Sequence, residues 1–320
     1  MRQIGRYLPE YREMRARMSL LDLCKTPDAA AEVTVLAVQK LGVDAAIIFA
    51  DILLPLEPMG VGLGYVRGEG PLIDRPVRTR ADLGRLRDVD PTDGVPFVFE
   101  AIRKARKGLG GRVPLIGFAG APFTLASYLV EGRPSQDFLA TKHLMHTDPG
   151  TWRMLMERLA EMTTSYLQAQ IAAGAEAVQV FDSWIGCLSP DDYRRFVLPY
   201  TRRVIGAVSP GVPVIHFGTG TAGLLELMRD AGGDVIGLDW RVDLGEAWRR
   251  LGDGVAVQGN LDPALLLTTP EEIRRGVRRV LDSAGGRPGH IFNLGHGVLP
   301  DTPWEHVVLM VRTVHEMSRR

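Results

Sequence analysis

Several short apolar runs in the sequence end at a polar side chain that can carry charge or donate a hydrogen bond. Polar residues at such positions often cap turns, and α/β enzymes also place their reactive groups there. A carboxylate at a strand end can stabilise a developing cation, and a histidine can transfer a proton near neutral pH. The residues at these positions are Asp51, Asp182, Ser183, His216, Asp239, Asn260 and His296.

Two arginines, Arg2 and Arg6, lie four residues apart near the start of the sequence, with Gln3, Ile4 and Gly5 between them. In a helix this spacing would place both guanidinium groups on one face. In a loop, Gly5 would let the backbone approach a ligand closely. Either arrangement suits a carboxylate ligand, because guanidinium forks bind carboxylates with paired hydrogen bonds. The alternative is a solvated terminus without a binding role.

Two histidines at strand ends lead to different expectations. His296 stands between Gly295 and Gly297, which leave room around its imidazole, and its ordinary pKa suits hydrogen bonding or proton transfer. His216 could be a zinc ligand, because imidazole nitrogens commonly bind zinc. Two positions later, however, the residue is Gly218 rather than a second ligand, so we expect no metal there.

A glycine-rich segment, residues 218–223, follows one apolar run and precedes a helical stretch, and Asp239 lies nineteen residues beyond Gly220. This context fits a dinucleotide-binding fingerprint. The segment lies late in the chain, however, and the alternation of apolar runs with helices continues past it. A glycine-rich loop at the mouth of a barrel explains the same residues, so both interpretations stay open here.

The elements that must position these residues follow from the order of the apolar runs. Seven runs, each short and apolar on both faces, alternate with helical stretches, as in a parallel sheet covered by helices. They span residues 45–50, 115–118, 177–181, 214–217, 235–238, 255–258 and 291–294. Helix starts are marked by cap-and-proline pairs at Asp148-Pro149, Thr269-Pro270 and Thr302-Pro303.

This pattern predicts an α/β fold, a (β/α)8 TIM barrel that forms a single domain over residues 1–320 and has its first strand truncated at the N-terminus. Reactive groups in such barrels lie at the carboxyl ends of the strands. We expect Met1-Arg2 to lie where a first strand would end. Residues 61–93, rich in Gly, Pro, Arg and Asp, should form an excursion from the barrel.

Composition narrows the function class. The 320 residues include 38 basic and 38 acidic side chains, so the net charge of zero gives no argument for nucleic-acid binding. No apolar stretch approaches the length of a membrane span, and two cysteines, Cys24 and Cys187, form no disulfide framework. With no signal peptide in the sequence, we expect a cytoplasmic protein that binds neither membrane nor nucleic acid.

Two long motifs make the sequence resemble a known family. The opening Met-Arg-Gln-Ile-Gly-Arg-Tyr-Leu-Pro-Glu-Tyr is similar to the first signature of uroporphyrinogen decarboxylases, with Ile4 where Ala is usual. Residues 117–132 resemble the second signature over its whole length, and residues 293–297 and 47–51 also match. Members of the family normally have a helix and the first strand ahead of the first signature. We therefore expect that residues upstream of Met1 are missing from this sequence.

The resemblance implies a homodimeric barrel that needs neither cofactor nor metal. It implies conversion of the four acetate side chains of uroporphyrinogen III to methyl groups, giving coproporphyrinogen III in haem biosynthesis. A corrinoid- or zinc-dependent methyltransferase shares this barrel and is the main alternative; an NAD oxidoreductase and a non-catalytic porphyrin-binding protein are others. The residues implied for catalysis are Asp51, Arg2, Arg6, Tyr128 and His296. Those implied for substrate binding are Arg2, Gln3, Ile4, Gly5, Arg6, Asp51, Tyr128, Ser183 and His296.

The implied chemistry gives these residues separate tasks. Loss of CO2 leaves an electron pair on a methylene, so without a cofactor the pyrrole ring itself must accept the pair after protonation of a ring carbon. An ionised Asp51 would stabilise the ring cation through the pyrrole N–H groups. Arginines would bind carboxylates, while hydroxyl and imidazole groups would donate further hydrogen bonds. The proton donor stays open between His296, a water held by an arginine, and Arg2, whose guanidinium is a reluctant acid.

Overall fold

Seven parallel strands form the central sheet of the computed structural model, which describes residues 5–66, 70–208 and 210–318. Strands that follow one another in this sheet are also adjacent in it. Because every pair is parallel, the carboxyl ends of all seven strands lie at the same edge. The strands are β1 (Ala46–Ile47), β4 (Leu115–Gly120), β5 (Ala177–Asp182), β6 (Val214–Gly218), β7 (Val235–Gly237), β8 (Ala256–Leu261) and β9 (His290–Leu294). The curled α/β architecture and all seven predicted strands are confirmed.

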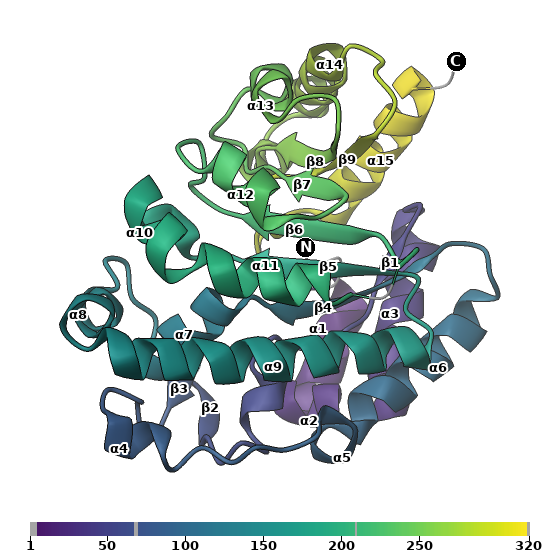
Figure 1. Ribbon diagram of the computed structural model, residues 1–320. Helices are drawn as coiled ribbons and strands as arrows, with labels where there is room; N and C mark the ends of the chain where they lie inside the picture. Colours follow the sequence, from purple (N-terminus) through teal and green to yellow (C-terminus); the bar gives the residue numbers. More distant parts are fainter. Residues whose placement is uncertain (1–4, 67–69, 209, 319–320) are drawn as a thin grey trace.

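Helices cover the outside of this sheet and connect each strand to the next, as parallel pairing requires (Figure 1). In Figure 1, α9 runs along the outside of the sheet, and α13, α14 and α15 lie around β7, β8 and β9. None of the helices within the described ranges is both long and apolar enough to cross a membrane. The longer helices are α1 (Pro9–Arg17), α2 (Leu20–Lys25), α3 (Pro27–Leu41), α6 (Pro96–Leu109), α7 (Pro122–Glu131), α8 (Leu139–Thr147), α9 (Pro149–Ala173), α10 (Pro190–Phe196), α11 (Leu198–Gly206), α12 (Leu225–Ala231), α13 (Leu244–Leu251), α14 (Pro270–Ala284) and α15 (Trp304–Ser318).

Helix α9 shows how the local sequence fixes an element. The carboxylate of Asp148 accepts the N–H of Thr151 at 3.0 Å, and Pro149 begins the helix where no N–H partner is needed. Gly174 ends it with a φ of 116°, a conformation that favours glycine. The apolar stripe on one face of this helix is buried, with Trp152 against Phe123 of α7 and Tyr166 against Phe99 of α6. It consists of Trp152, Leu155, Leu159, Met162 and Tyr166.

The segment after β1 leaves the barrel, as predicted, and forms a small structure of its own. Strands β2 (Leu63–Val66) and β3 (Gly70–Ile73) pair antiparallel, and two short helices follow, α4 (Arg80–Leu83) and α5 (Pro91–Gly94). Backbone hydrogen bonds from Ile73 to Gly132 at 2.8 Å and from Val77 to Leu129 at 2.9 Å attach the segment to the end of α7. The excursion therefore supports the helix that follows β4.

Candidate active site

Asp51 lies beyond the carboxyl end of β1, and only 6% of its surface is exposed. Its Oδ1 accepts the N–H of Leu53 at 3.0 Å, and its carbonyl accepts the N–H of Leu54 at 3.3 Å. The chain therefore folds around the carboxylate as it enters a short 3-10 helix, η1 (Leu54–Leu56). A buried carboxylate oriented by its own turn is in place before a cationic ligand arrives, as electrostatic catalysis requires.

Tyr128, on the helix that follows β4, and Ser183, just past the end of β5, are linked through one tryptophan. Residues 117–132 fold as the end of β4 and helix α7, which carries the half-buried Tyr128. The Tyr128 ring packs edge-on against Trp184, with 5.9 Å between ring centres, and Trp184 directly follows Ser183. The Ser183 carbonyl in turn accepts the hydroxyl of Thr219 at 2.5 Å. These contacts hold the ends of β4, β5 and β6 together.

His296 is exposed just past the carboxyl end of β9 and lies beside Trp240, with ring centres 6.2 Å apart. Gly295 makes this placement geometrically feasible, because a Cβ there would lie 2.4 Å from the backbone nitrogen of Trp240. Gly297 faces open space instead. Gly295 thus serves a close approach of two backbones, and the prediction that both glycines leave room around the imidazole stays a prediction.

Arg6 lies in a turn ahead of α1, not in a helix, and its side chain is exposed. The N–H of Leu8 closes this turn on the carbonyl of Gly5 at 3.0 Å, and Arg12 Nε donates to the carbonyl of Arg6. The loop alternative therefore holds for Gly5 and Arg6. Arg2, Gln3 and Ile4 lie outside the described residues, so the pairing of two guanidinium groups stays a prediction.

Asp182 is the last residue of β5, whereas His216 is the middle residue of β6 and not the strand-end residue that the sequence predicts. The Asp182 carboxylate accepts hydroxyls from Thr124 on α7 at 3.3 Å and Thr201 on α11 at 3.4 Å. His216 Nε2 lies 3.8 Å from the same carboxylate, and both side chains are fully buried. Because both side chains are fully buried and Asp182 bonds to threonines of the covering helices, neither side chain is available to a substrate in the barrel.

Asp239 and Asn260 hold the loops after β7 in place. The buried Asp239 carboxylate accepts the N–H of Gly220 at 2.6 Å and two donors of Arg241 at 2.9 and 2.8 Å. Asn260 Nδ2 donates to the carbonyls of Asp239 and Val242 at 2.9 and 2.8 Å. A dinucleotide site needs its acidic residue free for a ribose hydroxyl. That interpretation of residues 218–223 is therefore wrong.

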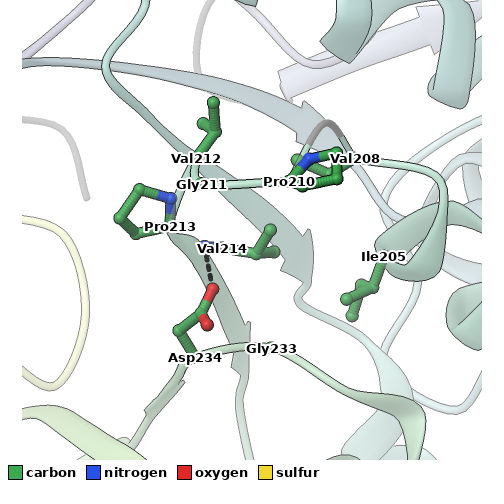
Figure 2. A pocket seen from close by; sticks show the side chains of 9 residues that line it. All are labelled: Ile205, Val208, Pro210, Gly211, Val212, Pro213, Val214, Gly233 and Asp234. Atoms are coloured by element: carbon green, nitrogen blue, oxygen red, sulfur yellow. Dashed lines mark hydrogen bonds between the residues drawn. The ribbon is translucent and has the colours of Figure 1, made fainter.

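Two hollows in the structure lie away from these residues. One, of about 400 Å³, opens near the amino ends of β6 and β7 (Figure 2). There the Asp234 carboxylate accepts the backbone N–H of Val214 at 2.8 Å. The other, of about 350 Å³, lies between α13 and the end of α14. In a TIM barrel the amino end serves stability and the carboxyl end carries chemistry, so Asp51 and His296 mark the candidate site instead.

Comparisons with known proteins identify the family of the chain. A family model described as Uroporphyrinogen decarboxylase (URO-D) matches residues 1–317. The chain is 55% identical to the uroporphyrinogen decarboxylase of Carboxydothermus hydrogenoformans, covering 99% of this chain and 91% of that protein. It is 56% identical to the enzyme of the same name from Sorangium cellulosum, covering 100% and 91%.

Solved structures match at the level of the fold. A methyltransferase from Methanosarcina mazei superposes with a TM-score of 0.76 at 20% identity, covering 94% of this chain and 90% of that one. A B12-independent methionine synthase from Shewanella sp. W3-18-1 gives 0.59 at 14% identity, covering 91% and 89%. At such low identity these likenesses concern architecture alone. By the family model and the identity to the two decarboxylases, the chain belongs to the uroporphyrinogen decarboxylase family.

Proposed function

We propose that this chain is a uroporphyrinogen decarboxylase, which converts the acetate side chains of uroporphyrinogen III to methyl groups and yields coproporphyrinogen III. Identity above 50% to decarboxylases over nearly the whole chain supports this activity. The observation that carries the mechanism is the buried Asp51 carboxylate at the carboxyl end of β1. The methyltransferase alternative has in its favour only a shared fold, at 20% identity.

Each turnover needs a temporary cation on one pyrrole ring. A proton added to the ring carbon beside the nitrogen creates that cation, and Asp51 stabilises it by accepting the pyrrole N–H groups. The bond to the carboxylate carbon then breaks, its electron pair moves into the ring, and CO2 leaves. A second proton then converts the methylene to methyl. The ring carbon releases the proton that it took up at the start. Each acetate thus consumes one proton and releases one CO2.

The remaining site residues bind the carboxylates of the substrate and supply the proton. Arg2 and Arg6 hold carboxylates as forks, and Gln3, Ile4 and Gly5 bind the substrate beside them. Tyr128 and Ser183 donate further hydrogen bonds. His296 supplies the proton. Because it is exposed, it can be reprotonated from solvent between successive decarboxylations.

The ring cation takes the electron pair itself, so we propose a reaction without cofactor or metal. We also propose that residues 1–320 act as one barrel domain, in a homodimer located in the cytoplasm. The family resemblance supports the single barrel domain, the homodimer and the reaction without cofactor or metal. Sedimentation of the purified protein would test the dimer, and a monomer at assay concentration would contradict it.

The test is incubation of the purified protein with anaerobically reduced uroporphyrinogen III, followed by oxidation and chromatography of the products. Porphyrins with seven, six, five and finally four carboxylates are expected. Asp51→Asn, checked for folding by circular dichroism, is the matched control and should yield little product. Unchanged substrate with folded wild-type protein would refute the proposed function.

A further inference from the structure

Arg241 is a positively charged residue near the carboxyl end of β7 that the mechanism has not used. Asp51 follows β1, and β7 lies four positions from β1 in the sheet order, across the barrel. We infer that Arg241 binds a carboxylate of the macrocycle on a pyrrole ring away from Asp51. This inference rests on the proposed function, because it concerns how the same substrate is held.

The guanidinium of Arg241 is fixed on one side and open on the other. Its Nη1 donates to the Asp239 carboxylate at 2.8 Å, and it lies over the Trp240 ring, 4.0 Å from the ring centre. The side chain of Asp239 is only 1% exposed, whereas that of Arg241 is 53% exposed. An arginine held in this way loses little conformational freedom when a ligand binds.

The ion pair does not use up the hydrogen-bonding capacity of the guanidinium. Asp239 also accepts the backbone N–H groups of Gly220 and Arg241, so three donors share its negative charge. A guanidinium carries five N–H donors. Since the Asp239 carboxylate takes only one of them, at Nη1, others can form a bidentate contact with an incoming carboxylate.

The neighbourhood of Arg241 also fits a carboxylate arm on a macrocycle of pyrrole rings. Trp240 joins Arg241 to His296, whose ring centre lies 6.2 Å from that of Trp240. The close backbone approach of Gly295 to Trp240 holds this arrangement. A cation, an apolar ring and an imidazole therefore lie together at the mouth of the barrel. Uroporphyrinogen carries a propionate as well as an acetate on every ring, so a carboxylate faces each side of the mouth.

The chain provides a matched control in Arg287. Its Nη2 lies 2.6 Å from Asp253, and its guanidinium lies over the Trp248 ring, 4.1 Å from the ring centre. The same three residue types thus meet, although the side chain of Asp253 is 99% exposed whereas that of Asp239 is 1% exposed. Arg287, however, lies between α14 and β9, at the amino end of the barrel. The loss of a guanidinium that lies over a tryptophan ring occurs in both variants, whereas a loss of substrate binding is expected only at Arg241.

The experiment compares wild type, Arg241→Gln, Arg241→Lys and Arg287→Gln in the anaerobic uroporphyrinogen assay, at low and high salt. We expect Arg241→Gln to raise KM about tenfold at low salt, with kcat within about twofold of wild type. The increase should shrink as salt screens the contact. Arg241→Lys keeps the charge but loses the planar guanidinium fork, so its KM should lie between those of wild type and Arg241→Gln. Arg287→Gln should keep the wild-type KM.

The possible failures are distinguishable. A folded wild-type protein that leaves uroporphyrinogen unchanged overturns the proposed function and this inference with it. Active wild type with an equal KM in Arg241→Gln and Arg287→Gln overturns the inference alone. A fall in kcat without a change in KM also overturns it, because that pattern indicates a positioning role. If Arg241→Gln does not fold, as thermal unfolding would report, a wild-type KM in Arg241→Lys overturns the inference.

Discussion

Replacing Asp51 by Asn removes one buried charge while preserving the local turn. Asn keeps an Oδ1 that can accept the Leu53 N–H, which Asp51 accepts at 3.0 Å. The fold should therefore survive, with the melting temperature within a few degrees of wild type. What the variant loses is the attraction between the carboxylate and the pyrrole cation in a site where Asp51 is only 6% exposed.

The size of that loss follows from Coulomb's law. Two unit charges about 4 Å apart at an effective dielectric constant of about 20 attract by about 4 kcal/mol. Since about 1.4 kcal/mol corresponds to a factor of ten, kcat/KM should fall by about 1,000-fold. Removal of single oxyanion-hole donors in other enzymes costs a similar amount, ~10²–10³ in kcat.

The assay is the rate of carboxylate loss from uroporphyrinogen, together with an intact mass that excludes conversion of Asn back to Asp. Asp90→Asn is the control, because the Asp90 carboxylate likewise accepts the N–H two residues ahead, at 2.8 Å, in the excursion outside the barrel. That variant should be fully active. A folded Asp51→Asn enzyme with the wild-type rate would remove Asp51 from the mechanism.

Three further predictions concern the last strand, β9, and the loop that follows it. His296→Gln keeps a hydrogen-bond donor but cannot release a proton, so kcat should fall about 100-fold and one limb of its pH profile should disappear; an unchanged limb would leave only a binding role. Gly295→Ala places a Cβ 2.4 Å from the Trp240 nitrogen and should lower the free energy of unfolding by about 2 kcal/mol, whereas Gly297→Ala should be neutral in the same denaturant titration. Burial lowers the pKa of His290 from its ordinary 6.5, so the unfolded chain binds the proton more readily and stability falls as the pH drops below about 6.5. His290→Gln should therefore lose less stability than wild type between pH 7 and 5, and an equal loss would contradict the assignment.

The fold could be predicted because its signals are local. A parallel strand that is buried on both faces appears as a continuous apolar run, and a helix start appears as a cap followed by proline. Both signals are present for β5 and α9, and the structure has them at the predicted positions. The hairpin of β2 and β3 was not predicted. Its strands of four residues pair only with each other and include Gly64, Gly70 and Pro71, residues that are rare in strands.

The site was less predictable, because the direction of a strand-end side chain depends on the sheet and not on its own residue type. Asp182 and Ser183 are adjacent in the sequence. The Asp182 carboxylate accepts hydroxyls of threonines on α7 and α11, whereas Ser183 begins the loop after β5, next to Trp184. Successive residues of a strand point to opposite faces, but only the observed register says which face lies inside. Tyr128 lies on a helix and was reached through the family signature alone.

Several polar residues at the strand ends have no proposed contact with the substrate. Their hydrogen bonds fix the positions of the residues that are proposed to bind it. Thr219 binds the carbonyl of Ser183, Asp239 binds Gly220, and Asn260 binds two carbonyls in the loop after β7. These bonds join the ends of β5, β6, β7 and β8 into one frame. A reaction that relies on a fixed charge gains only if that charge does not have to reorganise as the cation forms. The polar residues at the strand ends therefore divide into those proposed to meet the macrocycle and those that make the first group rigid.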